Sequence, residues 1–125
     1  MIVPLGDLDQ DGCDDLAAGA FLEDLGTRDQ GSVRILYGAG PSCAAGPRMA
    51  TLLGGIRDAQ AGFALASEGF DSDGDLRPEL AISFPAFVTQ GTNFGQVRLM
   101  AGRDVAAAAT EAPQDGVTPT ATTPI

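Results

Sequence analysis

The segment DLDQDGCDDLAAGAF, Asp7 to Phe21, places aspartates at alternate positions, then a glycine, two further aspartates and a short apolar run. The same plan returns 64 residues later in DSDGDLRPELAISFPAF, Asp71 to Phe87. A polar connection follows each copy, and then a strand-like segment, GSVRILYG at Gly31 to Gly38 and GQVRLMAG at Gly95 to Gly102. The shared order of acidic loop, apolar run and strand indicates an internal repeat.

The hydrophobic pattern within each copy predicts β-strands. Apolar residues alternate with their neighbours in both strand-like segments, which predicts one well-buried face in each, made of Val33, Ile35 and Tyr37 and of Val97, Leu99 and Ala101. The short run Leu16 to Phe21 contains a glycine and predicts a buried strand in a crowded position. A short helical turn is the alternative for that run.

The composition restricts the classes of function. The chain has 125 residues and 44% hydrophobic residues, which suits one domain with a modest core. Its net charge of -10 opposes binding to nucleic acid and to anionic lipid. Nine of the 17 acidic residues lie in the two acidic segments, Asp7–Asp15 and Asp71–Glu79, so the acidity is local.

Catalysis is disfavoured because the chain has no histidine, which is the usual general base and a usual zinc ligand. Acid–base chemistry by carboxylates alone would need two carboxyl groups in differently tuned environments, which one crowded loop does not suggest. We therefore expect a protein that is not an enzyme.

The charge of the first loop predicts a calcium site. Carboxylates this close repel one another, and a hard divalent cation relieves the repulsion. Calcium takes six to eight oxygen ligands, and alternate residues of a tight loop direct their side chains toward one point. The expected ligands are Asp7, Asp9, Asp11 and Asp15, with the carbonyl of Cys13 between them.

The loop has two other interpretations. An acidic surface turn without an ion is the simpler alternative, although Gly12 suits a turn that requires a positive φ. An EF-hand needs a glutamate at the twelfth position, which Ala18 and Ile82 occupy here. The last acid of each loop is therefore Asp15 or Glu79.

The residues resemble the FG-GAP repeat of integrin α-subunit β-propellers and their bacterial relatives. The resemblance covers about residues 1–103 and rests on D-x-D-x-D-G-x-x-D-L, on AGA at Ala18 to Ala20 and on GFALA at Gly62 to Ala66. It implies an all-β fold of antiparallel four-stranded blades around an axis, with a calcium loop between successive strands.

Carried over by position, the resemblance implies a calcium site in each copy. The first comprises the residues already named, and the second comprises Asp71, Asp73, Asp75 and Glu79, with Arg77 at the position of Cys13. Leu76 stands where Gly12 should recur, so we expect the second loop to be distorted or weak. SFP at Ser83 to Pro85 also replaces the GAP element.

The repeats divide the chain into three parts. Residues 1–54 are a partial repeat that begins at its calcium loop without the preceding strand, 55–103 are a second repeat, and 104–125 are a flexible tail with a short helix near its start. Because a propeller closes with typically four to eight blades, this chain is a fragment of a longer protein, a degraded gene, or a subunit that completes a propeller by association.

Location and redox state follow from two further features. The chain has neither an export signal nor a run long enough to span a bilayer, and a calcium-loop protein of this kind suits the extracellular space. We therefore expect a secreted or cell-surface parent whose signal lies upstream of Met1. Cys13 and Cys43 either pair in that oxidising environment or are two small, partly buried thiols.

The leading functional prediction is a calcium-binding segment of an integrin-α-like propeller that mediates adhesion or ligand binding. The alternatives are a noncatalytic propeller beside a secreted phospholipase or polysaccharide-degrading domain, and a purely structural repeat. The expected partners are an extracellular protein or carbohydrate, and neighbouring blades of a longer chain or another subunit; nucleic acid binding and membrane insertion are not expected.

Overall fold

The computed structural model describes residues 1–67, 71–112 and 119–125. Strands dominate this part of the chain, and its one helix, α1, spans Gly102–Ala106. No helix among the described residues is long and apolar enough to cross a membrane. The all-β prediction is therefore confirmed.

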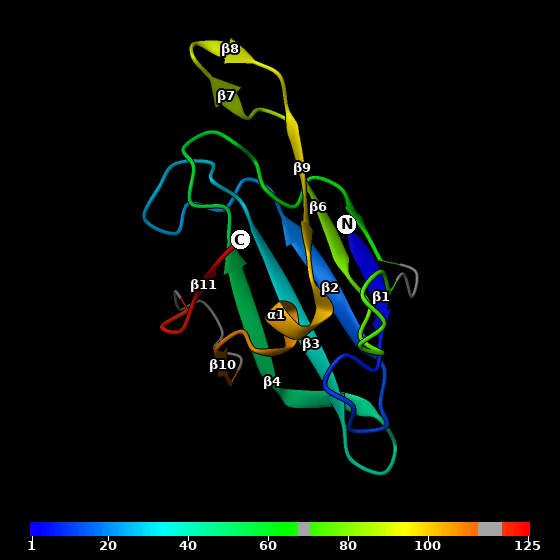
Figure 1. Cartoon of the computed structure of the whole chain (residues 1–125). Helices are drawn as coiled ribbons and strands as arrows, with labels where there is room; N and C mark the ends of the chain where they lie inside the picture. Colours follow the sequence, from blue (N-terminus) through cyan, green and yellow to red (C-terminus); the bar gives the residue numbers. More distant parts are fainter. Residues whose placement is uncertain (68–70, 113–118) are drawn as a thin grey trace.

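The first sheet is an antiparallel meander of four strands, β1 (Ile2–Gly6), β2 (Asp15–Ala20), β3 (Ser32–Ala39) and β4 (Ala44–Leu53) (Figure 1). The expectation that the first repeat lacks the strand before its acidic loop is wrong, because β1 is that strand. Its five residues include Pro4, which weakens the strand signal but is tolerated at a sheet edge. The alternative of a helical turn after the acidic loop is also wrong, since that run forms β2.

The second sheet has three strands in the order β5 (Leu65–Ala66), β6 (Leu80–Phe84) and β9 (Gln96–Met100). Between β6 and β9 the chain forms a separate hairpin, β7 (Val88–Thr89) and β8 (Thr92–Asn93), which projects away from both sheets in Figure 1. After β9 the chain enters α1 instead of a fourth strand. The predicted four-stranded blade is therefore present in full only in the first repeat, within the residues described.

The two sheets enclose one hydrophobic core. The first sheet contributes buried Ala17, Val33 and Ile35, and the second contributes buried Leu80 and Ile82. Val105 of α1 and Ala108 after it join the same cluster. In Figure 1, β6, β9 and α1 lie in front of the first sheet.

The predicted buried face of the second strand-like segment is wrong. Val97 and Leu99 are 70% and 56% exposed, whereas Val33 and Ile35, 64 residues earlier, are fully buried. The strand register is the same in both copies, because Leu16 pairs with Leu36 and Leu80 pairs with Met100. The second sheet therefore keeps the alternation but turns its other face toward the core.

A close backbone approach connects the two repeats. A Cβ atom on Gly19 of β2 would collide with the carbonyl oxygen of Gly62, and one on Gly62 would lie 2.6 Å from the carbonyl oxygen of Ser32. The rings of Phe21 and Phe63 meet edge to face beside this contact, with centroids 5.0 Å apart. The crowded position expected for this run is confirmed, since glycine is needed where two backbones approach this closely.

The C-terminal segment contradicts the expectation of a flexible tail. The strand β10 (Thr110–Glu111) pairs antiparallel with β4, and β11 (Thr123–Pro124) pairs parallel with it. The amide of Ile125 donates to the carbonyl of Leu53 at 2.9 Å, and its side chain packs against the core. Sequence pattern missed these short strands because backbone pairing with β4, rather than apolar periodicity, holds them. The rest of the predicted tail, residues 113–118, lies outside the described residues.

Candidate metal centres

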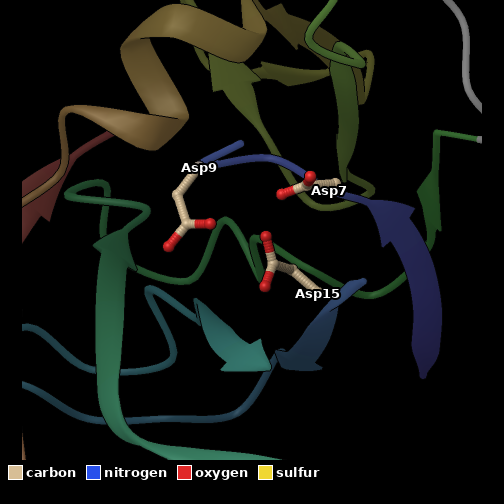
Figure 2. A group of neighbouring side chains, drawn as sticks. All are labelled: Asp7, Asp9 and Asp15. Atoms are coloured by element: carbon tan, nitrogen blue, oxygen red, sulfur yellow. The ribbon is translucent and has the colours of Figure 1, made fainter. Parts of the chain in front are cut away.

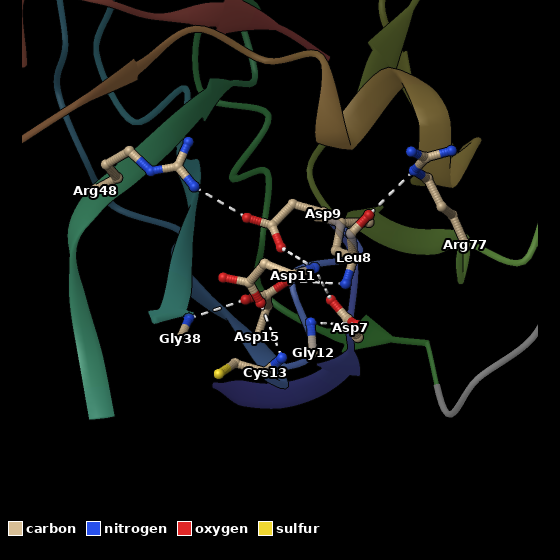
Figure 3. A network of polar contacts seen from close by, with 10 residues as sticks. All are labelled: Asp7, Leu8, Asp9, Asp11, Gly12, Cys13, Asp15, Gly38, Arg48 and Arg77. Atoms are coloured by element: carbon tan, nitrogen blue, oxygen red, sulfur yellow. Dashed lines mark hydrogen bonds and ion pairs between the residues drawn. The ribbon is translucent and has the colours of Figure 1, made fainter. Parts of the chain in front are cut away.

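The first acidic loop connects β1 to β2 and is folded by its own carboxylates. The Asp7 carboxylate accepts hydrogen bonds from the amides of Asp11 and Gly12, both at 2.9 Å, and the Asp11 carboxylate accepts one from the Cys13 amide at 2.8 Å (Figure 3). Such bonds to backbone amides fix a turn without using a cation. They also set the direction in which the remaining carboxylates point.

Three carboxylates of this loop converge. Oxygens of Asp7, Asp9 and Asp15 lie within 4.8 Å of one another, and Figure 2 shows these side chains directed toward a common point. Asp11 lies outside this group of three, and its carboxylate faces the Cys13 amide instead. The predicted role of the Cys13 carbonyl stays a prediction.

Asp15 is the buried member of the group. It is fully buried at the start of β2 and accepts hydrogen bonds from the amides of Leu8 at 2.8 Å and Gly38 at 2.9 Å. Burial raises the pKa of Asp15 and outweighs these two hydrogen bonds, which favour the charged form. A buried carboxylate whose charge is this costly is one that a bound cation would stabilise.

The second loop, between β5 and β6, repeats this geometry. The Asp71 carboxylate accepts from the amides of Gly74 and Leu76, at 2.8 and 3.0 Å, and Asp75 accepts from Arg77 at 2.8 Å. Glu79 takes the place of Asp15 and accepts from the Ser72 amide at 2.8 Å. Again three carboxylates have oxygens within 4.8 Å of one another, those of Asp71, Asp73 and Glu79.

The expected distortion of the second loop is not found. Leu76 adopts a φ of 66°, close to the left-handed conformation of Gly12, and the hydrogen bond from this position to the first aspartate of the loop is kept. Each loop also has an earlier position with positive φ, which is Gln10 at 62° in the first and Gly74 at 75° in the second. At these two positive-φ positions each loop therefore has one glycine and one residue with a side chain, and their order is reversed between the two loops.

Unpartnered oxygens show whether the second loop fits a metal ion. Glu79 is 2% exposed, yet its Oε1 has no hydrogen-bond partner among the described residues, and neither does the buried Oδ2 of Asp75. Buried polar atoms nearly always have a hydrogen-bond partner, and a buried carboxylate oxygen without one destabilises the fold. A cation that prefers oxygen ligands fits these carboxylates, so the residues of the second loop suit the calcium ion that the resemblance implies.

The first loop has a protein cation close by. The Arg48 side chain, on β4, forms an ion pair with Asp9 at 3.0 Å (Figure 3). Its guanidinium also lies over the Tyr37 ring, 5.2 Å from the ring centroid. The residue 64 positions after Arg48 is Ala112, so the arginine does not recur at the corresponding position of the second repeat. Sequence reasoning missed Arg48 because it is 39 residues from Asp9 and only the folding of β4 brings it near.

The two loops lie next to each other. Arg77 Nε of the second loop donates to the Leu8 carbonyl of the first at 3.2 Å (Figure 3). An open cleft of about 480 Å³ separates them, and it is lined from both sides by Leu5, Gly6, Asp7, Gln10, Asp71, Leu76 and Pro78. Both acidic groups therefore border one concave surface.

A disulfide fixes the first loop to the neighbouring turn at the same end of its sheet. Cys13 and Cys43 are bonded, with Cα atoms 5.2 Å apart and a sequence separation of 30. The alternative of two free thiols is wrong. The bond connects the acidic loop to the β3–β4 turn.

The match to a protein family falls on this same region. Residues 2–36 match the family model of the FG-GAP repeat. The chain carries an FG-GAP repeat. The match spans β1, the first acidic loop, β2 and most of β3. A search of curated proteins found no match to the chain.

FG-GAP repeats form blades of β-propellers and are typical of extracellular proteins, and the β1–β4 sheet is such a blade. The second repeat lies beyond the matched residues. Its assignment rests on the 64-residue spacing and on the hydrogen bonds that its acidic loop shares with the first.

Proposed function

We propose that this chain is a calcium-binding FG-GAP segment of an exported β-propeller, in which one ion in each acidic loop stiffens a surface used for adhesion or ligand binding. The observation that carries the proposal is the repeated group of three carboxylates, with the buried and unpartnered Oε1 of Glu79 in the second copy. In this proposal the ions stabilise structure and perform no chemistry.

The donor chemistry favours calcium over a transition metal. Every side chain in the two groups offers carboxylate oxygen, which is the ligand type of hard cations, and the chain has no histidine. The ligands would be the carboxylates of the two groups, Asp7, Asp9 and Asp15 and then Asp71, Asp73 and Glu79. Asp11 and Asp75, and the carbonyls of Cys13 and Arg77, are the further oxygens available at each loop.

Export and adhesion have separate support. The Cys13–Cys43 disulfide suits an oxidising compartment, where such bonds persist. The cleft between the loops gives a concave surface bordered by both proposed sites, which suits a protein or carbohydrate ligand. Binding there would depend on calcium if the ions hold the two walls in place.

Thermal unfolding with calcium or with a chelator tests the metal sites. A ligand that binds only the folded state stabilises it by about 2.7 kcal/mol at a hundredfold excess over its Kd, so calcium should raise the melting temperature. Calorimetric titration should find two sites in the wild type and one in either Asp9→Asn or Asp73→Asn. Asp14→Asn is the matched control, because Asp14 lies outside both groups. An unchanged melting temperature in all four proteins would contradict the proposal.

The adhesive role needs its own measurement. Immobilised matrix proteins and a panel of glycans should retain the wild type in calcium and release it in chelator. Retention that the chelator and Asp73→Asn both leave unchanged would separate ligand binding from the metal sites and refute this part of the proposal.

A further inference from the structure

The Cys13–Cys43 disulfide joins a buried residue to an exposed one. Cys13 is 4% exposed, and its Cβ atom packs against β3 at Gly38, where an added Cβ would lie 3.1 Å from it. Cys43 is exposed in the β3–β4 turn. A thiolate breaks a disulfide by attacking one of its two sulfurs, and access decides which one. A thiol from solution therefore reaches this bond at Cys43.

The backbone at Cys43 also favours an exchangeable bond. Cys43 has a φ of 50°, in the left-handed region, where a residue with a Cβ atom pays about 1–2 kcal/mol. Disulfides that are exposed or held under strain are reduced more readily than buried structural ones, and they are the labile or regulatory ones. Exposure and backbone conformation thus point the same way at this residue.

The bond attaches the middle of the first acidic loop to the sheet. The amides of residues 11–13 donate to carboxylates of the same loop, chiefly that of Asp7. These hydrogen bonds shape the loop but do not fix it to β3 or β4. The disulfide supplies a covalent attachment, from Cys13 to the β3–β4 turn.

Opening the bond would loosen one side of the first group of carboxylates and leave the other in place. Asp15 stays fixed, because it is buried at the start of β2 and its carboxylate accepts from the Gly38 amide of β3. Asp7 is hydrogen-bonded to the segment that would be freed. That segment would have to be ordered again before Asp7 and Asp15 could share one ion, and this ordering lowers the calcium affinity.

The second loop has no such attachment at the corresponding positions. Arg77 and Ala107 stand 64 residues after Cys13 and Cys43. A thiol should therefore act on the first loop and spare the second, which makes the second loop an internal reference.

We propose that Cys43 is a site of thiol–disulfide exchange with small thiols, and that the oxidised bond holds the first loop in its high-affinity form for calcium. The reagent's thiolate bonds to Cys43 Sγ, and the electron pair of the S–S bond leaves on Cys13 Sγ, which takes up a proton. A second thiolate attacks the mixed disulfide and releases Cys43, which also takes up a proton, so two reagent thiols become one disulfide. A small disulfide, acting as oxidant, reverses the reaction.

The proposal rests on the first calcium site proposed above and adds a reciprocal effect. If reduction weakens calcium binding by a given factor, calcium opposes reduction by the same factor, because the two equilibria are linked. Calcium would therefore protect the bond, and loss of calcium would expose it to reduction.

Calorimetric calcium titration of oxidised and dithiothreitol-reduced protein tests this control. In an Asp73→Asn background, which isolates the first loop, reduction should weaken the affinity about fivefold or more. In an Asp9→Asn background the second loop should keep its affinity. Absence of calcium binding by the oxidised Asp73→Asn protein would refute the proposed function itself. Equal affinity in both redox states, or equal weakening at both loops, would overturn the redox proposal alone.

The reduction equilibrium supplies a second measurement, on the wild type. Saturating calcium should lower the equilibrium constant for reduction by dithiothreitol by the factor found in the titration. An equilibrium constant that calcium leaves unchanged would contradict the linkage.

A monothiol identifies the attacked sulfur. Brief treatment of the native protein with mercaptoethanol, stopped with N-ethylmaleimide, should leave the thiol on Cys43 and the maleimide on Cys13. Trypsin separates the two, because Arg28 and Arg34 lie between the cysteines. A mixed disulfide found mainly on Cys13 would overturn the assignment of Cys43.

Discussion

Leu76 adopts the left-handed backbone conformation that Gly12 adopts 64 residues earlier, with φ values of 66° and 92°. This conformation costs about 1–2 kcal/mol for a residue with a Cβ atom. Glycine removes that cost but loses about 0.5–1 kcal/mol of conformational entropy on folding. Because Leu76 is 81% exposed, little burial is lost. Leu76→Gly should therefore stabilise the protein by about 0.5–1 kcal/mol in urea unfolding.

The first loop supplies the matched comparison for this substitution. Gln10→Gly, at the other positive φ, should also stabilise, whereas Gly12→Ala and Gly74→Ala should destabilise by a similar amount. Destabilisation by Leu76→Gly would mean that its side chain has a contact that its exposure does not suggest.

The contact of Gly19 with Gly62 predicts intolerance to any side chain. Gly19→Ala would drive its methyl group into the backbone of the other repeat, which cannot move as a flexible side chain could. We expect a loss of about 3 kcal/mol in the free energy of unfolding. Ala18→Ser, at the next position of β2, is the control and should change stability little. Equal stability of Gly19→Ala and the wild type would show that the repeats can separate at this point.

Loss of the disulfide should affect stability and one metal site. A closed loop with the 30-residue separation of Cys13 and Cys43 is worth about 3–4 kcal/mol in the chain-entropy account. Cys13→Ser/Cys43→Ser should unfold at correspondingly lower urea concentration and bind calcium more weakly at the first loop. Calcium binding at the second loop, measured in an Asp9→Asn background, should not change. Equal weakening of calcium binding at both loops would show that the disulfide acts through global stability alone.

Arg48 should reduce the calcium affinity of the first loop. Its guanidinium already neutralises part of the charge on Asp9, so Arg48→Gln leaves a more negative site. For one partly exposed charge at this range we expect affinity about threefold to tenfold tighter. Titration in an Asp73→Asn background isolates the first loop. Arg103→Gln is the charge-matched control and should leave the affinity as it is.

The Arg28–Asp58 pair predicts a defined acid sensitivity. Arg28 donates hydrogen bonds to both carboxylate oxygens of Asp58, at 2.7 and 2.8 Å, and this lowers the pKa of Asp58 below its ordinary value. Because the pKa of Asp58 is lower in the folded state than in the unfolded state, its ion pair stabilises the fold at pH values above the unfolded-state pKa of about 3.9. That stabilisation is lost as the pH falls through the pKa of the folded state.

Asp58→Asn should therefore be less stable than the wild type at about pH 6 and converge with it toward about pH 3, measured by urea midpoints without calcium. In an Arg28→Gln background the same substitution should have little effect at either pH. A stability difference between Asp58→Asn and the wild type that does not change with pH would instead assign the loss of stability to packing.

The sequence predicted those features whose causes are local. The acidic spacing predicted both loops, and the alternation in Gly31 to Gly38 predicted β3 and its buried residues. Alternation also located β9, but it cannot say which of two faces meets the core, because the neighbouring sheet decides that. For this reason the expected burial of Val97 and Leu99 was wrong.

Contacts between distant segments were beyond prediction. Nothing near Arg48 in the sequence indicates Asp9, and nothing in Thr123–Pro124 indicates a parallel partner in β4. The residue type alone disfavours a positive φ at Leu76. The hydrogen bonds to Asp71 hold that backbone in place despite its intrinsic preference.

The pairing of β10 and β11 with β4 has a consequence for misassembly. An unprotected outer strand offers its amides and carbonyls to any extended chain, which is how amyloid-like stacks begin. Here Met49, Ala50, Leu52 and Leu53 already face partners from the same molecule. Fibre growth from this side must first displace Thr110–Glu111 and Thr123–Pro124, so a change that releases these two segments from β4 would raise the risk of aggregation.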